Sequence, residues 1–212
     1  MKLIGSLTSP YVRKIRVALL EKNLPFEFVV DSPWETSTHV PDFNPLGKVP
    51  ALVTDDGETL FDSNIIAEYI ELMTELKAAS PNAASGLQLF PNDRLAALRV
   101  RQLVMLADGI GDAGVNIFLE NRRPADKQYT EWIERQTGKI TRGLDALERH
   151  ASAGSRLGSD KLNLADVAAG CMLLWLDLRL ASLNWREGHP ALTSLVDRLA
   201  ARPSFQQTTP PL

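Results

Sequence analysis

Residues 44–52 constrain the fold of this chain more than any other stretch. Two prolines, one glycine and one lysine precede a short apolar run there, which predicts a tight loop leading into a buried strand. Pro50 has no N–H to donate to a sheet, so it belongs at the first residue of a strand or at a sheet edge. A proline at such a turn favours a cis peptide bond, which would leave the N–H and C=O of Val49 free for an extended peptide ligand. A trans loop proline without a ligand is the alternative, and this stretch alone does not decide between them.

A helix separates two short strands at the start of the chain. Residues 2–7 form an apolar run, and apolar residues at helical spacing follow Pro10, which suits the first position of a helix. Ser9 is then the N-cap, at the positive end of the helix dipole. Residues 23–25 end this helix, and residues 26–30 alternate as a strand. A β-α-β unit of this size predicts a parallel pair of strands with a right-handed crossover.

A hairpin and a further helix are expected next. The segment 33–43 is predicted to be a partly helical connection, and 49–53 is the third strand. The Asp-Asp-Gly turn at 55–57 joins this strand to a fourth at 58–61. Asp62 is a good N-cap for the helix that follows. The predicted order is therefore β-α-β-α-β-β-α.

The pattern of the chain changes at 78–90. Small and polar residues with a proline and a glycine predict a linker there. Beyond it strand signals fade, and apolar residues recur at helical spacing. We therefore expect an α/β domain at 1–77 and an all-helical domain at 91–212. The helices of the second domain are expected around residues 95–110, 132–147, 163–182 and 190–201.

Charge and cysteine content argue against several classes of function. The net charge of −3 and the pI near 5.7 disfavour a nucleic-acid or anionic-membrane partner. Cys171 is the single cysteine, which favours a reducing, cytoplasmic compartment over a disulfide-stapled secreted domain. The N-terminal residues lack a hydrophobic signal run, and no apolar run reaches the length expected of a membrane span. The three histidines are far apart and lack HExxH spacing, so a metal site has little support.

Motifs in the second half of the chain are assigned structural roles. Residues 109–114 fit GxGxxG, but they lie within helical periodicity rather than after a strand, so we reject a dinucleotide site. Asn163 and Asp166 have the spacing of a capping box at a helix start. Cys171 lies among apolar residues on that helix and is expected to be a buried, inert thiol.

Four motifs in sequence order resemble the glutathione transferase family, and the resemblance covers essentially the whole chain. It is to the bacterial members that carry a serine in the first motif. The resemblance implies a thioredoxin-like N-terminal domain followed by an all-helical domain, with glutathione as co-substrate. The motifs are Ser9-Pro10-Tyr11-Val12-Arg13-Lys14-Ile15-Arg16, Asn44 to Leu52, Phe61-Asp62-Ser63-Asn64-Ile65-Ile66 and Asn163-Leu164-Ala165-Asp166.

The resemblance also implies which residues bind glutathione. In the family, an acidic residue and a serine at the start of the third helix hold the γ-glutamyl end, and these are Asp62 and Ser63 here, with Asp in place of the commoner Glu. The backbone of Val49, held by cis-Pro50, would pair with the cysteinyl moiety in strand-like fashion. Lys48 matches a residue that reaches the glycine carboxylate. The alternatives are a plain helix cap for Asp62 and Ser63 and a solvated loop position for Lys48.

Ser9 matches the position of the catalytic serine or cysteine in the family. A hydroxyl donor at a helix N-terminus stabilises a thiolate, so the bound thiol ionises nearer neutral pH and becomes the nucleophile. The alternative is that Ser9 is only an N-cap, although one residue can fill both roles. Tyr11 is interpreted as a cleft-wall or packing residue.

The function implied by the resemblance is a cytosolic, homodimeric enzyme that activates the glutathione thiol for attack on a small apolar electrophile. Trp175, Trp185 and residues near 108–118 are candidates for the second pocket. A glutathione-dependent isomerase or dehalogenase is the alternative on the same fold. A non-catalytic interaction protein is the alternative from another class. The serine in the first motif and the acid-serine pair favour glutathione binding over a bare scaffold.

Overall fold

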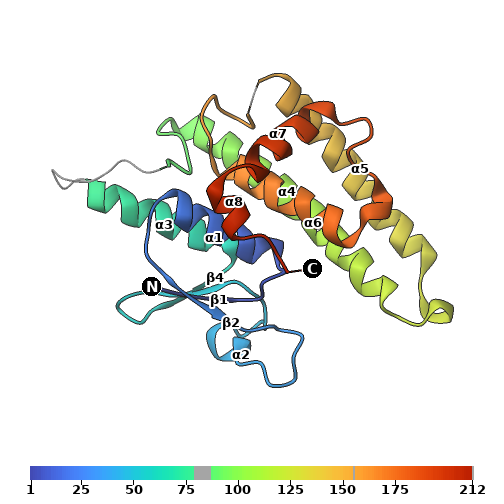
Figure 1. Ribbon diagram of the computed structural model, residues 1–212, viewed down its shortest axis with the longest axis horizontal. Helices are drawn as coiled ribbons and strands as arrows, with labels where there is room; N and C mark the ends of the chain where they lie inside the picture. Colours follow the sequence, from blue (N-terminus) through green and yellow to red (C-terminus); the bar gives the residue numbers. More distant parts are fainter. Residues whose placement is uncertain (79–86, 155, 212) are drawn as a thin grey trace. The chain divides into compact units, whose positions relative to one another are not determined.

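The computed structural model of the protein describes residues 1–78, 87–154 and 156–211 (Figure 1). These residues divide into two compact units. The first unit contains Met1–Leu89 together with Arg202–Leu212, and the second contains Phe90–Ala201.

The two units differ from the expected domains at their boundaries: residues 87–89 of the predicted linker belong to the first unit, Phe90 belongs to the second, and the C-terminal segment changes unit. The helical domain was predicted to continue to residue 212, whereas Arg202–Leu212 groups with the first unit. The linker predicted at 78–90 falls largely on residues 79–86, which lie outside the described residues.

The first unit is built on a four-stranded mixed sheet with the strand order β2-β1-β3-β4. The strands β1 and β2 are parallel, whereas β1 and β3, and β3 and β4, are antiparallel, so the predicted parallel pair and the predicted hairpin are both confirmed. The third strand begins two residues later than expected, after Val49 and Pro50. The strands are β1 (Lys2–Gly5), β2 (Glu27–Val30), β3 (Ala51–Val53) and β4 (Thr59–Phe61).

Helices cover both faces of this sheet. Figure 1 shows α1 (Pro10–Glu21) and α3 (Ser63–Ala78) on one face and the short α2 (Val40–Phe43) on the other. Ile4 and Ala51 form a buried cluster with Val40 of α2. Because side chains alternate along a strand, the neighbouring residues of β1 and β3 face the opposite side, toward α1 and α3. The predicted order β-α-β-α-β-β-α is confirmed.

The last residues return to the first unit because they make polar contacts with α1. Arg202 donates two hydrogen bonds to the Glu21 carboxylate, both at 2.7 Å. The helix α8 (Pro203–Gln207) follows, and Arg13 donates to the carbonyl oxygen of Phe205 at 3.0 Å. These partners are far apart in sequence, so local patterns could not place this segment.

The second unit is helical, as predicted. The helix α4 packs against both α5 and α6, and residues 109–114 lie within α4, which confirms the rejection of a dinucleotide fingerprint. Within the described part of the chain, α4 alone is long and apolar enough, by length and composition, to span a bilayer, and half of that apolar window is buried inside the protein. The helices are α4 (Arg94–Asn121), α5 (Thr130–Ser152), α6 (Leu164–Arg179) and α7 (Pro190–Ala200), with 3₁₀ turns at Ala125–Lys127 and Ala181–Leu183.

The capping box at the start of α6 is confirmed. Asn163 Oδ1 accepts from the N–H of Ala165 at 2.8 Å, and Asp166 accepts from the N–H of Asn163 at 3.2 Å. Asp166 also accepts from the N–H of Leu157 at 2.8 Å, so the box fixes the loop that leads into the helix. Burial raises the pKa of the Asp166 carboxyl to about 6. Cys171, on the same helix, is buried as expected.

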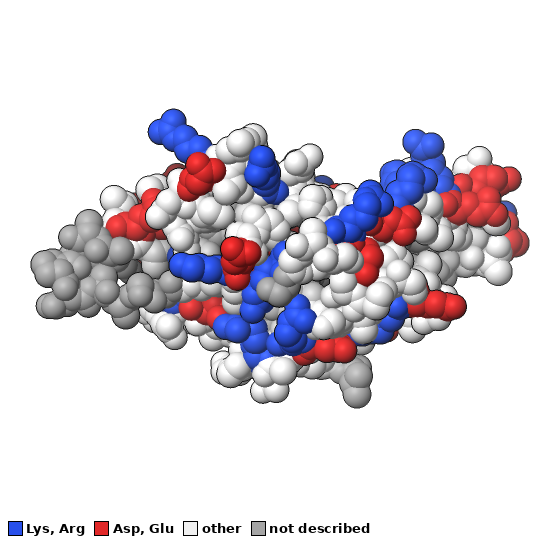
Figure 2. Space-filling model, turned by 90° about the horizontal axis from the view of Figure 1, so that it is seen from above, with Lys and Arg blue, Asp and Glu red and all other residues white. Residues whose placement is uncertain are grey.

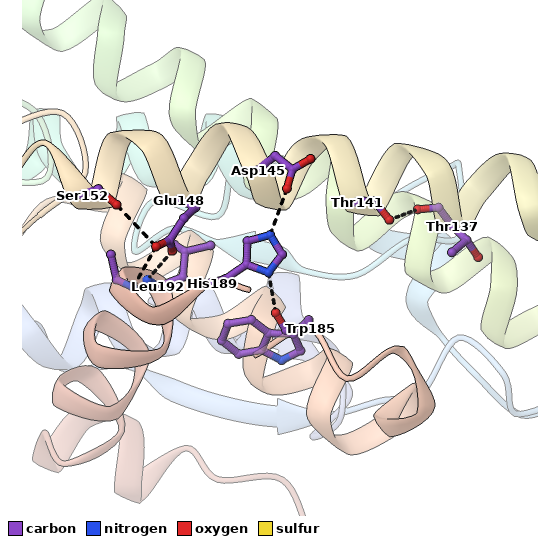
Figure 3. A network of polar contacts seen from close by, with 9 residues as sticks. Thr137, Thr141, Asp145, Glu148, Ser152, Trp185, His189 and Leu192 are labelled. Carbon is purple, nitrogen blue, oxygen red and sulfur yellow. Dashed lines mark hydrogen bonds and ion pairs between the residues drawn. The ribbon is translucent and has the colours of Figure 1, made fainter. Parts of the chain in front are cut away.

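A polar network joins α5 to α7 (Figure 3). The Glu148 carboxylate accepts from the N–H groups of Ala191 and Leu192, at 2.9 and 2.8 Å, which are otherwise unpaired donors at the start of α7. The Nδ1–H group of His189 donates to the Trp185 carbonyl oxygen at 2.6 Å, and its Nε2 lies 3.2 Å from Asp145. The network therefore supplies the N-terminal cap that α7 lacks in its own sequence.

Candidate functional site

The sequence-predicted site residues converge on one edge of the sheet in the first unit. The pairing register sets Ile4 of β1 opposite Ala51 of β3, and Ala51 opposite Phe61 of β4. The end of β1, the start of β3 and the end of β4 therefore meet at the same edge. The loop to Ser9 leaves from β1, Val49 and Pro50 lead into β3, and Asp62 and Ser63 follow β4.

Ser9 is the N-cap of α1, with Pro10 at the first helical position as predicted. Its Oγ accepts from the N–H of Val12 at 3.3 Å. A hydroxyl group that accepts one hydrogen bond still has its own hydrogen to donate. The half-buried Ser9 can therefore cap the helix and also donate to a thiolate placed at the positive end of the helix dipole.

The peptide bond between Val49 and Pro50 is cis, which is one of the two alternatives that the sequence pattern left open. The side chain of Val49 packs against the core cluster under α2, which fixes the residue on the protein. Its N–H and C=O take part in no backbone hydrogen bond within the described residues. These two groups can pair with an extended peptide in the manner of an added strand.

Asn44 organises the loop before Pro50, a role that the sequence analysis did not assign. Its side chain is buried, and its Nδ2 donates to the Lys48 carbonyl oxygen at 2.8 Å while its Oδ1 accepts from the N–H of Leu46 at 3.0 Å. An Asn directly before Pro45 is a turn signal that could have indicated this role. The Lys48 side chain is exposed, so its ammonium is accessible to a ligand carboxylate.

Asp62 caps α3, as predicted, in a backbone conformation that the sequence did not reveal. Its carboxylate accepts from the N–H of Asn64 at 2.7 Å, and its carbonyl oxygen accepts from the N–H of Ile66 at 3.0 Å. Its φ of +70° lies in the left-handed region, and this conformation costs a non-glycine residue about 1–3 kcal/mol. Residues in such conformations cluster at ligand sites.

Ser63 is the first residue of α3 and is buried. Neither its hydroxyl nor its N–H has a hydrogen-bond partner within the described residues. The N-terminus of a helix presents N–H groups and a partial positive charge to an anion. Ser63 can therefore offer two donors to a carboxylate.

The tryptophans expected in a second pocket belong to the core of the helical unit. Trp175 is buried with its ring edge-on to Phe118, the centroids 6.1 Å apart. Trp185 is buried, and its indole N–H donates to Asp177 at 2.6 Å. Core packing explains both residues, so they no longer support a pocket. Tyr11 is half-buried in the first turn of α1, in agreement with a packing role.

Acidic and basic side chains are both spread over the face shown in Figure 2. The part of the chain that the structure describes holds no group of three or more His, Cys, Asp and Glu side chains arranged to bind a metal ion. The groups gathered at the sheet edge are a hydroxyl donor, a free strand-like backbone and a helix N-terminus with an acid beside it. Such a set can bind a small peptide that carries a carboxylate, an amine and a thiol.

Comparison with known proteins finds a matching domain family for each half of the chain. Residues 8–73 match the model of the glutathione S-transferase N-terminal domain, and residues 130–198 match that of the C-terminal domain. An uncharacterized GST-like protein, YibF, from Escherichia coli is 46% identical over 211 residues, which cover 100% of this chain and 99% of that protein.

Two solved structures are similar over their full length. A glutathione S-transferase from Methylobacillus flagellatus with glutathione bound has a TM-score of 0.90 at 37% identity, covering 99% of each chain. A glutathione S-transferase from Methylobacterium radiotolerans in complex with glutathione sulfonate has a TM-score of 0.85 at 40% identity, covering 100% of this chain and 95% of the other. With both domain models matched and a relative of this identity along its whole length, the chain belongs to the glutathione S-transferase family.

Proposed function

We propose that this protein is a glutathione transferase that activates the glutathione thiol for attack on a small apolar electrophile. The observation that carries the proposal is the convergence of Ser9, the free Val49 backbone and the Asp62–Ser63 turn on one sheet edge. Two solved relatives, one with glutathione and one with glutathione sulfonate bound, support the ligand.

Each part of glutathione has a partner of suitable chemistry in this proposal. Ser63 and the N-terminus of α3 receive the γ-glutamyl carboxylate, and Asp62 receives the amine. The N–H and C=O of Val49 pair with the cysteinyl backbone, and the exposed Lys48 attracts the glycine carboxylate. Ser9 then donates to the thiol sulfur, and the hydrogen bond lowers the pKa of the bound thiol because it favours the charged form.

Ser9→Ala tests the catalytic step. Conjugation of glutathione to an activated aryl halide should slow by about 10- to 150-fold, since one hydrogen bond to a charged group is worth about 1.5–3 kcal/mol. Glutathione affinity, measured by calorimetry, should change little, because the other groups hold the rest of the molecule. Thr8→Ala, in the same loop, is the control and should keep the parent rate.

A second variant separates catalysis from helix capping. Ser9→Asp keeps a capping oxygen for α1 but cannot donate to a thiolate and repels it. We expect it to melt close to the parent protein and to lose more activity than Ser9→Ala. Full activity in either variant would show that Ser9 is only a helix cap.

We also propose that the enzyme is a cytoplasmic homodimer. On α3, the side chains of Ile65, Leu72 and Leu76 are exposed at helical spacing and form an apolar stripe. On α4, Leu95, Leu98 and Met105 do the same. One apolar stripe on each unit suits a pairing in which the first unit of one subunit meets the helical unit of the other.

Light scattering at micromolar concentration tests the dimer. The parent should have twice the mass of the 23.4 kDa chain. Leu72→Lys should shift the protein toward monomer, because it places a charge in the apolar stripe. Glu134→Lys, an exposed change of the same kind on α5, which carries neither stripe, is the control. A monomeric parent would contradict the proposal.

A further inference from the structure

Two arginines of the helical unit converge on one aromatic ring. The guanidinium carbon of Arg122 lies 5.8 Å from the centroid of the Phe118 ring, and that of Arg179 lies 5.6 Å from the same centroid. Arg122 is the C-cap of α4, and Arg179 is the last residue of α6. Trp175 holds the Phe118 ring from another side, edge-on, with the ring centroids 6.1 Å apart. The two cations are therefore gathered where the ends of α4 and α6 meet.

These two guanidinium groups make no hydrogen bond or ion pair with the residues that the structure describes. The acids nearest to them in sequence already have other partners. Glu120 pairs with Arg123 at 3.6 Å, and Asp177 pairs with Arg186 at 2.8 Å. Within the described part of the chain, the positive charge of the two arginines is therefore not balanced by an acidic side chain.

The ends of the two helices balance only part of this charge. The C-terminus of a helix carries about half a negative charge, so two helix ends offset roughly one of the two positive charges. About one positive charge then remains for a ligand to neutralise. Both arginine side chains are exposed, so a ligand from solution can reach them. The remaining charge favours a small monoanion.

The aromatic ring holds the cations without using their hydrogen-bond donors. A cation over an aromatic ring is attracted by the negative face of the ring. The N–H donors of each guanidinium therefore stay free for a ligand. They form a planar fork that matches the two oxygens of a carboxylate. This geometry favours a carboxylate over a spherical anion.

We propose that Phe118, Arg122 and Arg179 form a binding site for a small planar carboxylate on the helical unit. The carboxylate oxygens accept from the two guanidinium forks, and the ring keeps the two cations together. The site lies within one unit and uses none of the residues that are proposed to bind glutathione. Because charge and the planar pair of oxygens carry the recognition, a neutral amide of the same shape should bind weakly.

Calorimetry of the full-length protein with benzoate and with benzamide tests this site. The amide has nearly the same shape as the carboxylate but carries no charge. Benzoate should bind the parent at least about 10-fold more tightly than benzamide, because hydrogen bonds between two charged groups are stronger than those to a neutral acceptor. This preference should shrink as salt is added, because both arginines are exposed.

Three double variants locate the bound carboxylate. Arg122→Gln with Arg179→Gln should reduce the preference for benzoate to about 3-fold or less, because it removes both forks. Arg135→Gln with Arg142→Gln is the matched control, since it removes the same charge from exposed arginines of α5, and it should keep the parent preference. Arg122→Lys with Arg179→Lys keeps the charge but loses the planar forks, so its preference should fall between those of the parent and the first variant.

Each result supports or overturns the site. No binding of benzoate by the parent, or equal binding of benzoate and benzamide, would overturn it. A full preference in Arg122→Gln with Arg179→Gln would overturn it as well, because the benzoate would then be bound elsewhere, such as at the start of α3. A lysine variant equal to the parent would overturn recognition by planar forks.

Glutathione titration keeps this test separate from the proposed function. Arg122→Gln with Arg179→Gln should bind glutathione as the parent does, because it changes none of the proposed glutathione contacts. A parent that binds benzoate as expected but does not bind glutathione would overturn the proposed function and leave this inference standing.

Discussion

Replacing Lys22 with methionine should destabilise the first unit by about 3–5 kcal/mol, because it leaves a buried carboxylate without its cation. Lys22 Nζ lies 2.6 Å from the Glu71 carboxylate, and the two side chains are 3% and 8% exposed. Among the described residues, the other partner of that carboxylate is the N–H of Leu89, at 3.1 Å. One neutral donor does not replace the lost ammonium, so the free energy of unfolding should fall by most of the stated range.

The double variant Lys22→Met, Glu71→Leu shows whether desolvation is the cause. Apolar side chains of similar volume remove both charges and their desolvation cost, so this variant should lie within about 1 kcal/mol of the parent or be more stable. The exposed pair Lys2 and Glu27, whose charged atoms are 3.8 Å apart, is the control. Breaking it with Lys2→Met should cost less than about 1 kcal/mol.

Urea unfolding followed by circular dichroism measures the loss, and hydrogen exchange assigns it to α1 and α3. Protection should fall in these helices, because Lys22 and Glu71 join them. A loss below about 1 kcal/mol in Lys22→Met would refute the argument from burial. The argument would also be refuted if the double variant lost as much free energy of unfolding as Lys22→Met and Glu71→Leu lose together.

Three further predictions concern the helical unit. Burial raises the pKa of the Asp166 carboxyl from 3.8 to about 6, so this group stabilises the fold fully below pH 3.8. The stabilisation, about 3 kcal/mol in all, is lost as the pH rises through 6. Denaturation of the parent and of Asp166→Asn at pH 4 and pH 6 should show this loss in the parent alone. Glu148→Ala should cost about 1.5–3 kcal/mol, since it removes the acceptor of two N–H groups of α7, and thermal melts against Glu148→Gln, which keeps an acceptor, measure it. Gly143→Ala should cost about 1–3 kcal/mol, because the added Cβ would lie 2.6 Å from Ile110 Cγ1. In the same melts, Gly109→Ala should stabilise α4 by about 0.5–1 kcal/mol, because a Cβ added there has no neighbour within 4 Å. The argument for Asp166 would be contradicted if the parent and Asp166→Asn changed stability equally between pH 4 and pH 6. An unchanged melting temperature of Glu148→Ala, or a raised one of Gly143→Ala, would contradict the other two arguments.

Local signals in the sequence were sufficient to predict most secondary structure and the site motifs. Ser9 and Pro10 predicted where α1 begins, because N-cap chemistry depends on residues within one turn. The capping box at Asn163 and Asp166 and the hairpin after β3 were predicted for the same reason. The cis peptide bond before Pro50 was one of two alternatives that the sequence left open, and the structure has it.

Tertiary structure decided every feature that depends on contacts between distant residues. The sequence did not indicate that Arg202 returns to Glu21, that Trp175 and Trp185 lie in the core, or that Lys14 is buried beside Asn64. Burial is a property of the packed fold, because whether a side chain loses water depends on which elements close over it. The sequence alone therefore determined the elements and the candidate residues, whereas the packing of α1 against α3 decided which of their side chains are buried.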